Sequence, residues 1–152
     1  MRIDSINRID LYKNVNVYLN LISDWKYCNW KEENFLYDLP KKWLLSFAVY
    51  DQNDLTGFCI ASNKIPNVYY IHLIFISGKS RGQSLGTTML EQAKKTAMEH
   101  HLDRIELRCP ESNTGALAFY QKKGFVITQK LKDETSGNEM DYYLRLALSP
   151  NQ

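Results

Sequence analysis

The chain has 152 residues, of which 19 are Lys or Arg and 17 are Asp or Glu, so its formal net charge is +2. Hydrophobic residues make up 44% and charged residues 24%, which is typical of a soluble globular protein. The small net charge argues against a nucleic-acid-binding protein. No apolar run is long enough for a transmembrane helix, so no membrane partner is expected. The length predicts one domain over residues 1–152.

The cysteines give no sign of disulfides or metal binding. Cys28, Cys59 and Cys109 are widely spaced, and no CxxC motif or Cys/His cluster occurs. The first twenty residues lack the continuous apolar stretch of a signal peptide. We therefore expect a reduced, cytoplasmic protein that holds no metal.

Hydrophobic periodicity divides the chain into strands and helices. Apolar residues at spacings of three and four predict a buried helix face that ends near residue 22, whereas the continuous apolar run at 68–76 is typical of a central strand buried on both faces. Asn113 and Gly124 fit the N-cap and C′ positions of a helix. The predicted elements are a strand at 2–6, a helix up to 22, a helix within 25–39, strands at 44–50, 55–61 and 68–76, a helix at 86–100, a strand at 104–109, a helix at 113–123, and strands at 125–131 and 140–148. This order predicts a mixed α/β sheet.

The loop after the central strand carries the most information. A buried strand runs through glycine-bearing residues 77–85 into an amphipathic helix, which brings free backbone N–H groups and a positive helix end together. Phosphate is the natural ligand of such a junction, and a plain connecting loop is the alternative. A P-loop is excluded because Leu73 stands where that motif requires a glycine. The dinucleotide fingerprint also fails, because Gly78, Gly82 and Gly86 are four residues apart.

Two segments resemble the GCN5-related N-acetyltransferase (GNAT) superfamily. The family's acyl-coenzyme A loop has the pattern Gln/Arg-x-x-Gly-x-Gly/Ala, and residues 81–86 match it except that Ser84 replaces the middle glycine. Residues 113–125 resemble a later signature, in which Asn opens a helix, Tyr lies near its end and Gly-Phe leads into the next strand. The resemblance implies the acyl-CoA N-acyltransferase fold, a single-domain α/β structure with a mixed, mostly antiparallel sheet flanked by helices.

The same resemblance implies transfer of an acetyl group from acetyl-CoA to a primary amine of a small molecule or peptide, by direct attack in a ternary complex. The strand backbone would bind the pantetheine arm and loop amides would bind the pyrophosphate. The remaining phosphate charge could be neutralised by Lys79, Arg81, Lys122 and Lys123, although each alone also fits a solvated surface charge. The cofactor-binding residues implied are Ile74, Phe75, Ile76, Arg81, Gly82, Gln83, Ser84, Leu85, Gly86, Thr87, Asn113, Tyr120 and Lys123.

Three side chains are candidates for catalysis. The family's equivalent of Tyr120 protonates the departing thiolate, although a tyrosine at this position also fits a plain core residue. His72 is a candidate general base because it titrates near neutrality, with a core histidine as the alternative. Glu106 is a comparable candidate, with a surface strand position as its alternative. A backbone N–H near Ile76 would stabilise the oxyanion.

The acceptor site is harder to predict. In the family it is built from the N-terminal helices and late strands, which here contribute an aromatic wall with carboxylates, although the same residues also fit simple packing of helices on the sheet. They are Trp25, Tyr27, Trp30, Glu33, Tyr37, Asp38, Tyr142 and Tyr143. Such a wall would suit a cationic amine or a peptide N-terminus. A homodimer is the default expectation for this fold.

Two other functions remain open from the sequence. Ser84 is compatible with a non-catalytic acyl-CoA-binding or regulatory domain, and the loop alone is compatible with a nucleotide-binding module. The charge distribution favours a polyanionic ligand in either case, because residues 78–132 carry ten basic and five acidic side chains.

Overall fold

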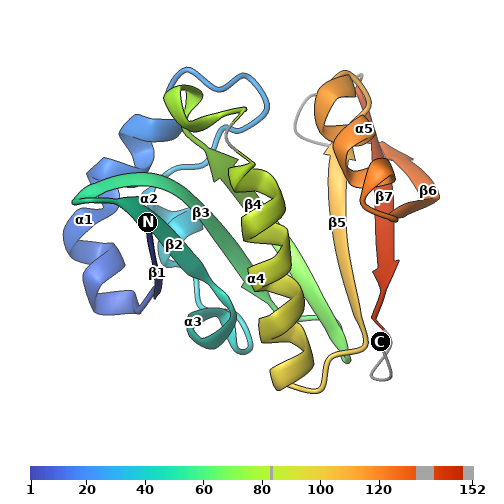
Figure 1. The fold of residues 1–152 in the computed structure, drawn as a ribbon, viewed down its shortest axis with the longest axis horizontal. Helices are drawn as coiled ribbons and strands as arrows, with labels where there is room; N and C mark the ends of the chain where they lie inside the picture. The colour runs from blue at the N-terminus through green and yellow to red at the C-terminus, as the bar shows by residue number, and fades with distance from the viewer. Residues whose placement is uncertain (83, 133–138, 149–152) are drawn as a thin grey trace.

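The computed structural model describes residues 1–82, 84–132 and 139–148. Within these residues seven strands form one sheet in the order β1-β2-β3-β4-β5-β7-β6 (Figure 1). Neighbouring strands are antiparallel except β4 and β5, which are parallel. The strands are β1 (Arg2–Ser5), β2 (Phe47–Asp51), β3 (Asp54–Ser62), β4 (Val68–Ile76), β5 (Arg104–Pro110), β6 (Val126–Lys132) and β7 (Met140–Ala147). The predicted mixed, mostly antiparallel sheet is confirmed.

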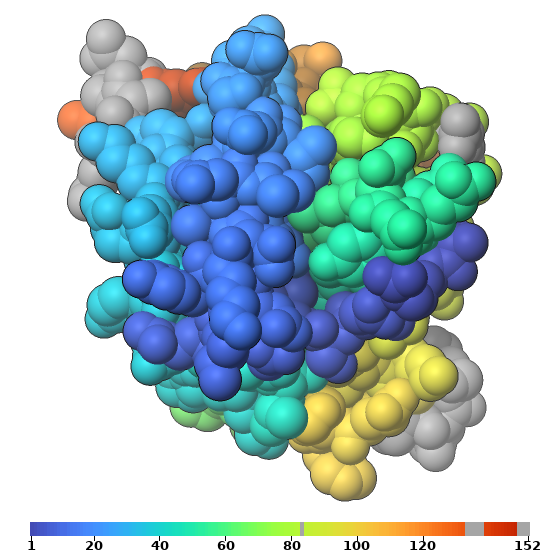
Figure 2. All heavy atoms as spheres, turned by 90° about the vertical axis from the view of Figure 1, so that its left-hand side faces the viewer, coloured from blue at the N-terminus to red at the C-terminus, as the bar shows by residue number. Residues whose placement is uncertain are grey.

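Helices cover both faces of the sheet, and each face has its own core. α1 and α2 pack on one face through residues such as Tyr18 and Phe35, and α4 packs on the other through Met89 and Ala93. Figure 2 shows α1 lying across one side of the molecule. The helices are α1 (Arg8–Ile22), α2 (Glu32–Leu36), α3 (Lys42–Leu45), α4 (Leu85–Glu99) and α5 (Thr114–Lys122), with a short 3₁₀ turn, η1 (Gly78–Ser80).

The predicted strand at 44–50 is wrong at its start. The chain forms α3 first, and β2 begins only at Phe47. Lys42, at the beginning of α3, is 1% exposed, and its Nζ donates to the carbonyl oxygens of Phe35 (2.5 Å) and Tyr37 (2.6 Å). Those carbonyls belong to α2 and its C-cap, so a tertiary contact that the apolar pattern does not encode supports α3.

β4 contains one residue more than the opposing stretch of β3. Ile60 of β3 pairs with Leu73. The next β3 residue, Ala61, pairs with Ile71, which leaves His72 as the extra residue of a β-bulge. Because of this bulge, the side chains of Ile71 and Leu73 pack into different cores, one on each face of the sheet, although they are two residues apart.

β4 and β5 are paired only near their beginnings. Their register runs from Val68–Arg104 to Ile71–Leu107, and no later pair occurs between the described residues of the two strands. Beyond this point the strands part toward their C-terminal ends (Figure 1). Residues 72–76 of β4 therefore have β3 on one side and no strand on the other, so half of their backbone N–H and C=O groups face a gap.

Candidate active site

The gap between β4 and β5 is a cleft of about 810 Å³, a volume typical of small-molecule sites. It is lined by β4 from Ile71 onward, the end of β5, α5 and the segment after α1. The residues predicted for the site that line this cleft are His72, Ile74, Phe75, Ile76, Arg81, Gly86, Asn113 and Tyr120. The structure thus gathers residues predicted from two separate segments, although among the described residues of the predicted loop at 81–87 only Arg81 and Gly86 line the cleft.

The α4 end of the cleft is a helix N-terminus without a side-chain cap. Ser84 is the N-cap residue, with a left-handed φ of 61°, and its side chain makes no capping hydrogen bond. The N–H groups in the first turn of α4 have no intrahelical acceptors, so they are suited to an anionic oxygen. A left-handed serine costs about 1 kcal/mol more than a glycine in the same conformation. Gln83 lies outside the described residues.

The other residues of the predicted loop have varied roles. Arg81 lies at the mouth of the cleft, where its Nε donates to the carbonyl oxygen of Ile76 at 3.2 Å. Leu85 packs into the core under α4, and Gly82 adopts a positive φ of 82°. Five predicted cofactor-binding residues do not line the cleft: Gly82, Ser84, Leu85, Thr87 and Lys123.

Tyr120 lies buried among aromatic rings. It lies on α5, is 8% exposed and packs edge-on against the rings of Phe119 and Phe125. None of the described residues hydrogen-bonds its hydroxyl. Burial, together with the nearby Cys109 thiol, raises the pKa of Tyr120 well above its ordinary value. The phenol therefore stays protonated at neutral and mildly alkaline pH.

His72 lies in the cleft as a neutral imidazole. Its Nε2 is 2.7 Å from Oγ of Ser62, and its ring contacts the edge of Tyr70. Burial lowers the pKa of His72 to about 4, helped by the positive charges of Lys64 and Lys42. A group of this pKa is a weak acceptor for the proton of an ammonium ion.

Glu106 does not line the cleft. Its side chain is 3% exposed, and Oε2 accepts hydrogen bonds from Nε of Arg104 and of Arg145, each at 2.8 Å. Oε1 accepts from the hydroxyl of Tyr143. Burial acts to raise the pKa of Glu106, but the hydrogen bonds from Tyr143 and the two arginines outweigh it and lower the pKa. Its position thus gives no support to a role as general base; it joins β5 to β7.

Glu106→Gln should therefore weaken the fold and spare the reaction. An amide cannot neutralise Arg104 and Arg145, so we expect the free energy of unfolding to fall by about 1–2 kcal/mol at pH 7. Because the folded-state pKa is lowered, the carboxylate's contribution is present above its unfolded pKa of about 4.3 and is lost as pH falls through the folded pKa. Urea unfolding should show that the difference in free energy of unfolding between the wild type and Glu106→Gln is smaller at pH 3 than at pH 7. A large loss of kcat in the folded variant would contradict this assignment.

The acceptor wall predicted from the sequence is only partly assembled. Trp25 and Tyr27 line the cleft, where Trp25 packs on Phe75 with ring centroids 5.2 Å apart. The hydroxyl of Tyr27 donates to the carbonyl oxygen of Ser112 at 3.3 Å. The wall residues that do not line the cleft are Trp30, Glu33, Tyr37, Asp38, Tyr142 and Tyr143.

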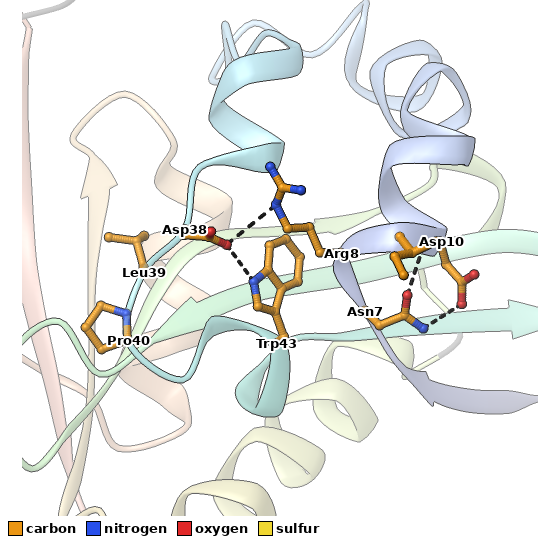
Figure 3. A pocket seen from close by; sticks show the side chains of 8 residues that line it. Asn7, Arg8, Asp10, Asp38, Leu39, Pro40 and Trp43 are labelled. Atoms are coloured by element: carbon orange, nitrogen blue, oxygen red, sulfur yellow. Dashed lines mark hydrogen bonds and ion pairs between the residues drawn. The ribbon is translucent and has the colours of Figure 1, made fainter.

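Asp38 belongs to a second hollow, of about 940 Å³, between the start of α1 and the segment before α3 (Figure 3). It accepts a hydrogen bond from Nε1 of Trp43 at 2.8 Å and pairs with Arg8 at 3.7 Å. Asn7 caps α1 by accepting from the backbone N–H of Asp10 at 2.8 Å. These polar groups bond to one another, and no candidate catalytic residue lines the hollow.

Two further residues in and beside the cleft were not predicted from the sequence. Arg108 lines it, and its Nε donates to Oδ2 of Asp141 at 3.1 Å. Ser62, fully buried, contacts His72. Each partner lies on another strand, so no local pattern could have revealed either pair. The described residues contain no cluster suited to a metal ion and no helix long and apolar enough to cross a membrane.

Comparison with known proteins agrees with this geometry. The model of the acetyltransferase (GNAT) family matches residues 15–125. The peptidyl-lysine N-acetyltransferase YjaB of Salmonella typhimurium is 29% identical over 104 residues, which cover 68% of this chain and 62% of that protein. The chain spans less than two thirds of the length of the first curated relatives it matches.

Solved structures share the fold. The ribosomal-protein-S18-alanine N-acetyltransferase of Escherichia coli superposes with a TM-score of 0.82 over 97% of this chain and 94% of its own, at 20% identity. A Bacillus anthracis acetyltransferase named for streptothricin, in complex with acetyl coenzyme A, superposes with a TM-score of 0.64 over 68% of this chain and 63% of its own, at 27% identity. With the family match covering more than half of its residues, the chain belongs to the GNAT family of acetyltransferases.

Proposed function

We propose that this protein is an N-acetyltransferase that transfers the acetyl group of acetyl-CoA to a primary amine of a small molecule or peptide. One observation carries the proposal: the parting of β4 and β5 places a free strand edge, the Tyr120 side chain and the start of α4 around a single cleft. Family membership supports it, as does the acetyl coenzyme A held by the Bacillus anthracis relative.

Three features of the cleft suit acetyl-CoA. The free edge of residues 72–76 can hydrogen-bond the amides of the pantetheine arm as a neighbouring strand would. The uncapped start of α4 and the guanidinium of Arg81 suit the pyrophosphate. Gly86 keeps side-chain atoms out of the narrow space beside Ile76 and Phe119.

The reaction would proceed by direct attack in a ternary complex. Acetyl-CoA supplies the acetyl group as a thioester. The neutral amine nitrogen attacks the carbonyl carbon, so that a C–N bond forms while the C–S bond breaks. Tyr120 donates its hydroxyl proton to the departing sulfur. The nitrogen carries one proton too many after the attack and releases it to solvent, and solvent returns a proton to Tyr120. Backbone N–H groups of residues 72–76 stabilise the negative charge that develops on the carbonyl oxygen.

The acceptor should enter as the free amine, because neither His72 nor Glu106 is suited to take its proton. We expect kcat/KM for the acceptor to rise with pH and to follow the acceptor's own pKa. Replacing a lysine side-chain amine, pKa about 10.4, by an α-amine, pKa about 8, should move the midpoint down by about two pH units. Initial rates for two such acceptors across pH 6 to about pH 10.5 measure this shift. Identical midpoints for both acceptors would indicate a general base in the enzyme.

The proposed function is tested by ligand-dependent melting and by thiol release. CoA and acetyl-CoA at 100 times Kd should each stabilise the fold by about 2.7 kcal/mol, whereas ATP and NAD should not. Release of free CoA thiol should then depend on an amine in a mixed panel. Tight acetyl-CoA binding without thiol release on any amine would support a non-catalytic domain instead. If ATP or NAD stabilised the fold and neither CoA nor acetyl-CoA did, the result would support a nucleotide-binding module.

A further inference from the structure

His72 and Ser62 form a pair to which the proposed reaction gives no role. His72 is the extra residue of the β4 bulge and lines the cleft. Ser62 is the last residue of β3 and has no exposed surface. The serine Oγ lies 2.7 Å from Nε2 of the histidine, close enough for a strong hydrogen bond. One hydrogen atom occupies this contact, and its origin decides what His72 presents to the cleft.

The surroundings of Ser62 identify it as the donor. Its Oγ already accepts a hydrogen bond from the backbone N–H of Lys64 at 3.3 Å. Among the described residues, Nε2 of His72 is the acceptor within reach of the serine hydroxyl proton. If Nε2 carried the hydrogen instead, that buried hydroxyl proton would have no acceptor, at a cost of about 1–3 kcal/mol. The favoured arrangement is therefore Oγ–H to Nε2, with the imidazole proton on Nδ1.

The second ring nitrogen is available to a ligand. No described residue hydrogen-bonds Nδ1 of His72, this nitrogen is not fully buried, and His72 lines the cleft, so a ligand in the cleft can reach it. The imidazole is neutral at pH 7, because burial lowers the pKa of His72 to about 4. A neutral ring of this tautomer offers an N–H donor to the cleft and no free lone pair.

The charges around His72 favour an oxygen atom over an ammonium group. Lys64 lies with Nζ 4.5 Å from the centroid of the Tyr70 ring, which itself contacts the imidazole. The two carboxylates whose charges act on Tyr70 are bound to arginines, Glu106 to two of them and Asp141 to Arg108, while Asp24 lines the cleft from the segment after α1. A hydrogen-bond donor beside a lysine is suited to a carbonyl or carboxylate oxygen.

We propose that Ser62 is a positioning residue that holds His72 with its proton on Nδ1, and that this N–H binds a carbonyl or carboxylate oxygen of the amine acceptor. The acceptor class is then an amine with a neighbouring C=O group, such as an amino acid or a peptide N-terminus, and not a plain alkylamine or polyamine. The acceptor role rests on the proposed function, because it requires acetyl transfer. The Ser62–His72 arrangement does not.

The arrangement is tested in the resting protein by long-range ¹H–¹⁵N NMR of labelled histidine. The chain has three histidines, and loss of one set of signals in His72→Asn assigns them. We expect Nδ1 protonated and Nε2 unprotonated in the wild type and in Ser62→Thr, and the opposite tautomer or a mixture in Ser62→Ala. A protonated Nε2 in the folded wild type overturns the proposal, whatever the activity.

The acceptor role is tested with alaninamide, alanine and propylamine, compared at equal free-amine concentrations. In His72→Asn the amide nitrogen is as many bonds from Cα as Nδ1, so the KM for alaninamide should stay within about threefold of wild type. In His72→Leu it should rise about tenfold. In His72→Leu the rise in KM should be smaller for propylamine, which has no C=O group to lose a hydrogen bond. An equal rise in KM for all three amines would overturn this role. A KM for alaninamide as high in His72→Asn as in His72→Leu would overturn it as well.

The two proposals fail in different ways. Absence of thiol release on every amine would overturn the proposed function and the acceptor role together, while the NMR spectrum would still decide the Ser62–His72 arrangement. Alanine and alaninamide separate a carboxylate from an amide oxygen as the preferred group. Thermal melts of Ser62→Ala and Ser62→Thr identify any variant that has lost its fold, and the threonine variant keeps the hydroxyl where alanine does not.

Discussion

Tyr120→Phe is expected to lower kcat for acetyl transfer about 100-fold while the KM for acetyl-CoA stays within about twofold. The ring of Tyr120 packs between Phe119 and Phe125, so phenylalanine should keep the shape of the cleft. Only the proton donor to the departing sulfur is lost. Because the pKa of Tyr120 is raised, the wild-type enzyme should not lose its acid as the pH approaches about 10. Steady-state kinetics with acetyl-CoA and a saturating amine measure both parameters.

Tyr69→Phe is the matched control for this prediction. Tyr69 is fully buried in the same core, and its hydroxyl donates to the carbonyl oxygen of Leu45 at 2.7 Å. Removing that hydroxyl should reduce the free energy of unfolding by about 1–2 kcal/mol and leave kcat unchanged. Tyr120→Phe should instead lower kcat and leave Tm nearly unchanged. Full turnover by Tyr120→Phe would mean that another group protonates the sulfur.

Gly86→Val is expected to weaken CoA binding at least about 30-fold, the second large effect. A Cβ at Gly86 would lie 3.3 Å from Cζ of Phe119 and 3.4 Å from Cδ1 of Ile76, both on the walls of the cleft. The two further methyl groups of valine have no room there without displacing these side chains. They would occupy the space between the start of α4 and the end of β4. Calorimetric titration with CoA measures the loss.

Thr87→Val is the control, because it introduces the same side chain one residue later. Valine is nearly isosteric with threonine, and Thr87 does not line the cleft while its backbone N–H remains in the first turn of α4. CoA affinity should therefore stay within about threefold of wild type. Circular dichroism must show both variants folded. A folded Gly86→Val protein with wild-type CoA affinity would contradict the assignment of this cleft as the CoA site.

Local patterns predicted most of the fold. β4 is confirmed over its whole predicted length because an apolar run of this kind is typical of a strand covered on both faces. The side chain of Asn113 caps α5 as expected, and Gly124 follows it with a positive φ of 100°. These features depend on residues close in sequence. α3 was missed because its buried Lys42 bonds to carbonyls near α2, a contact between elements.

Among the candidate catalytic residues, sequence could name the residue types but not their surroundings. His72 and Glu106 were equivalent candidates for a base, each an ionisable group in an apolar strand. His72 lines the cleft and is hydrogen-bonded to Ser62 of β3, whereas Glu106 of β5 is bound to Arg104 and Arg145. Both positions depend on which strands pair with β4 and β5. The residues adjacent to His72 or Glu106 in the sequence do not predict that pairing.

By itself the sequence determined the order of the strands and of the helices other than α3, the glycine-bearing loop that opens α4, and the helix that carries Tyr120. These follow from periodicity and from chain conformations set by adjacent residues. Only the tertiary structure decided that β4 and β5 part after Ile71, that the resulting cleft gathers two distant segments, and that Ser62 meets His72. The physical reason is that strand pairing, register and burial arise between residues far apart in the chain, and they set the pKa and hydrogen-bonding of every group in the cleft.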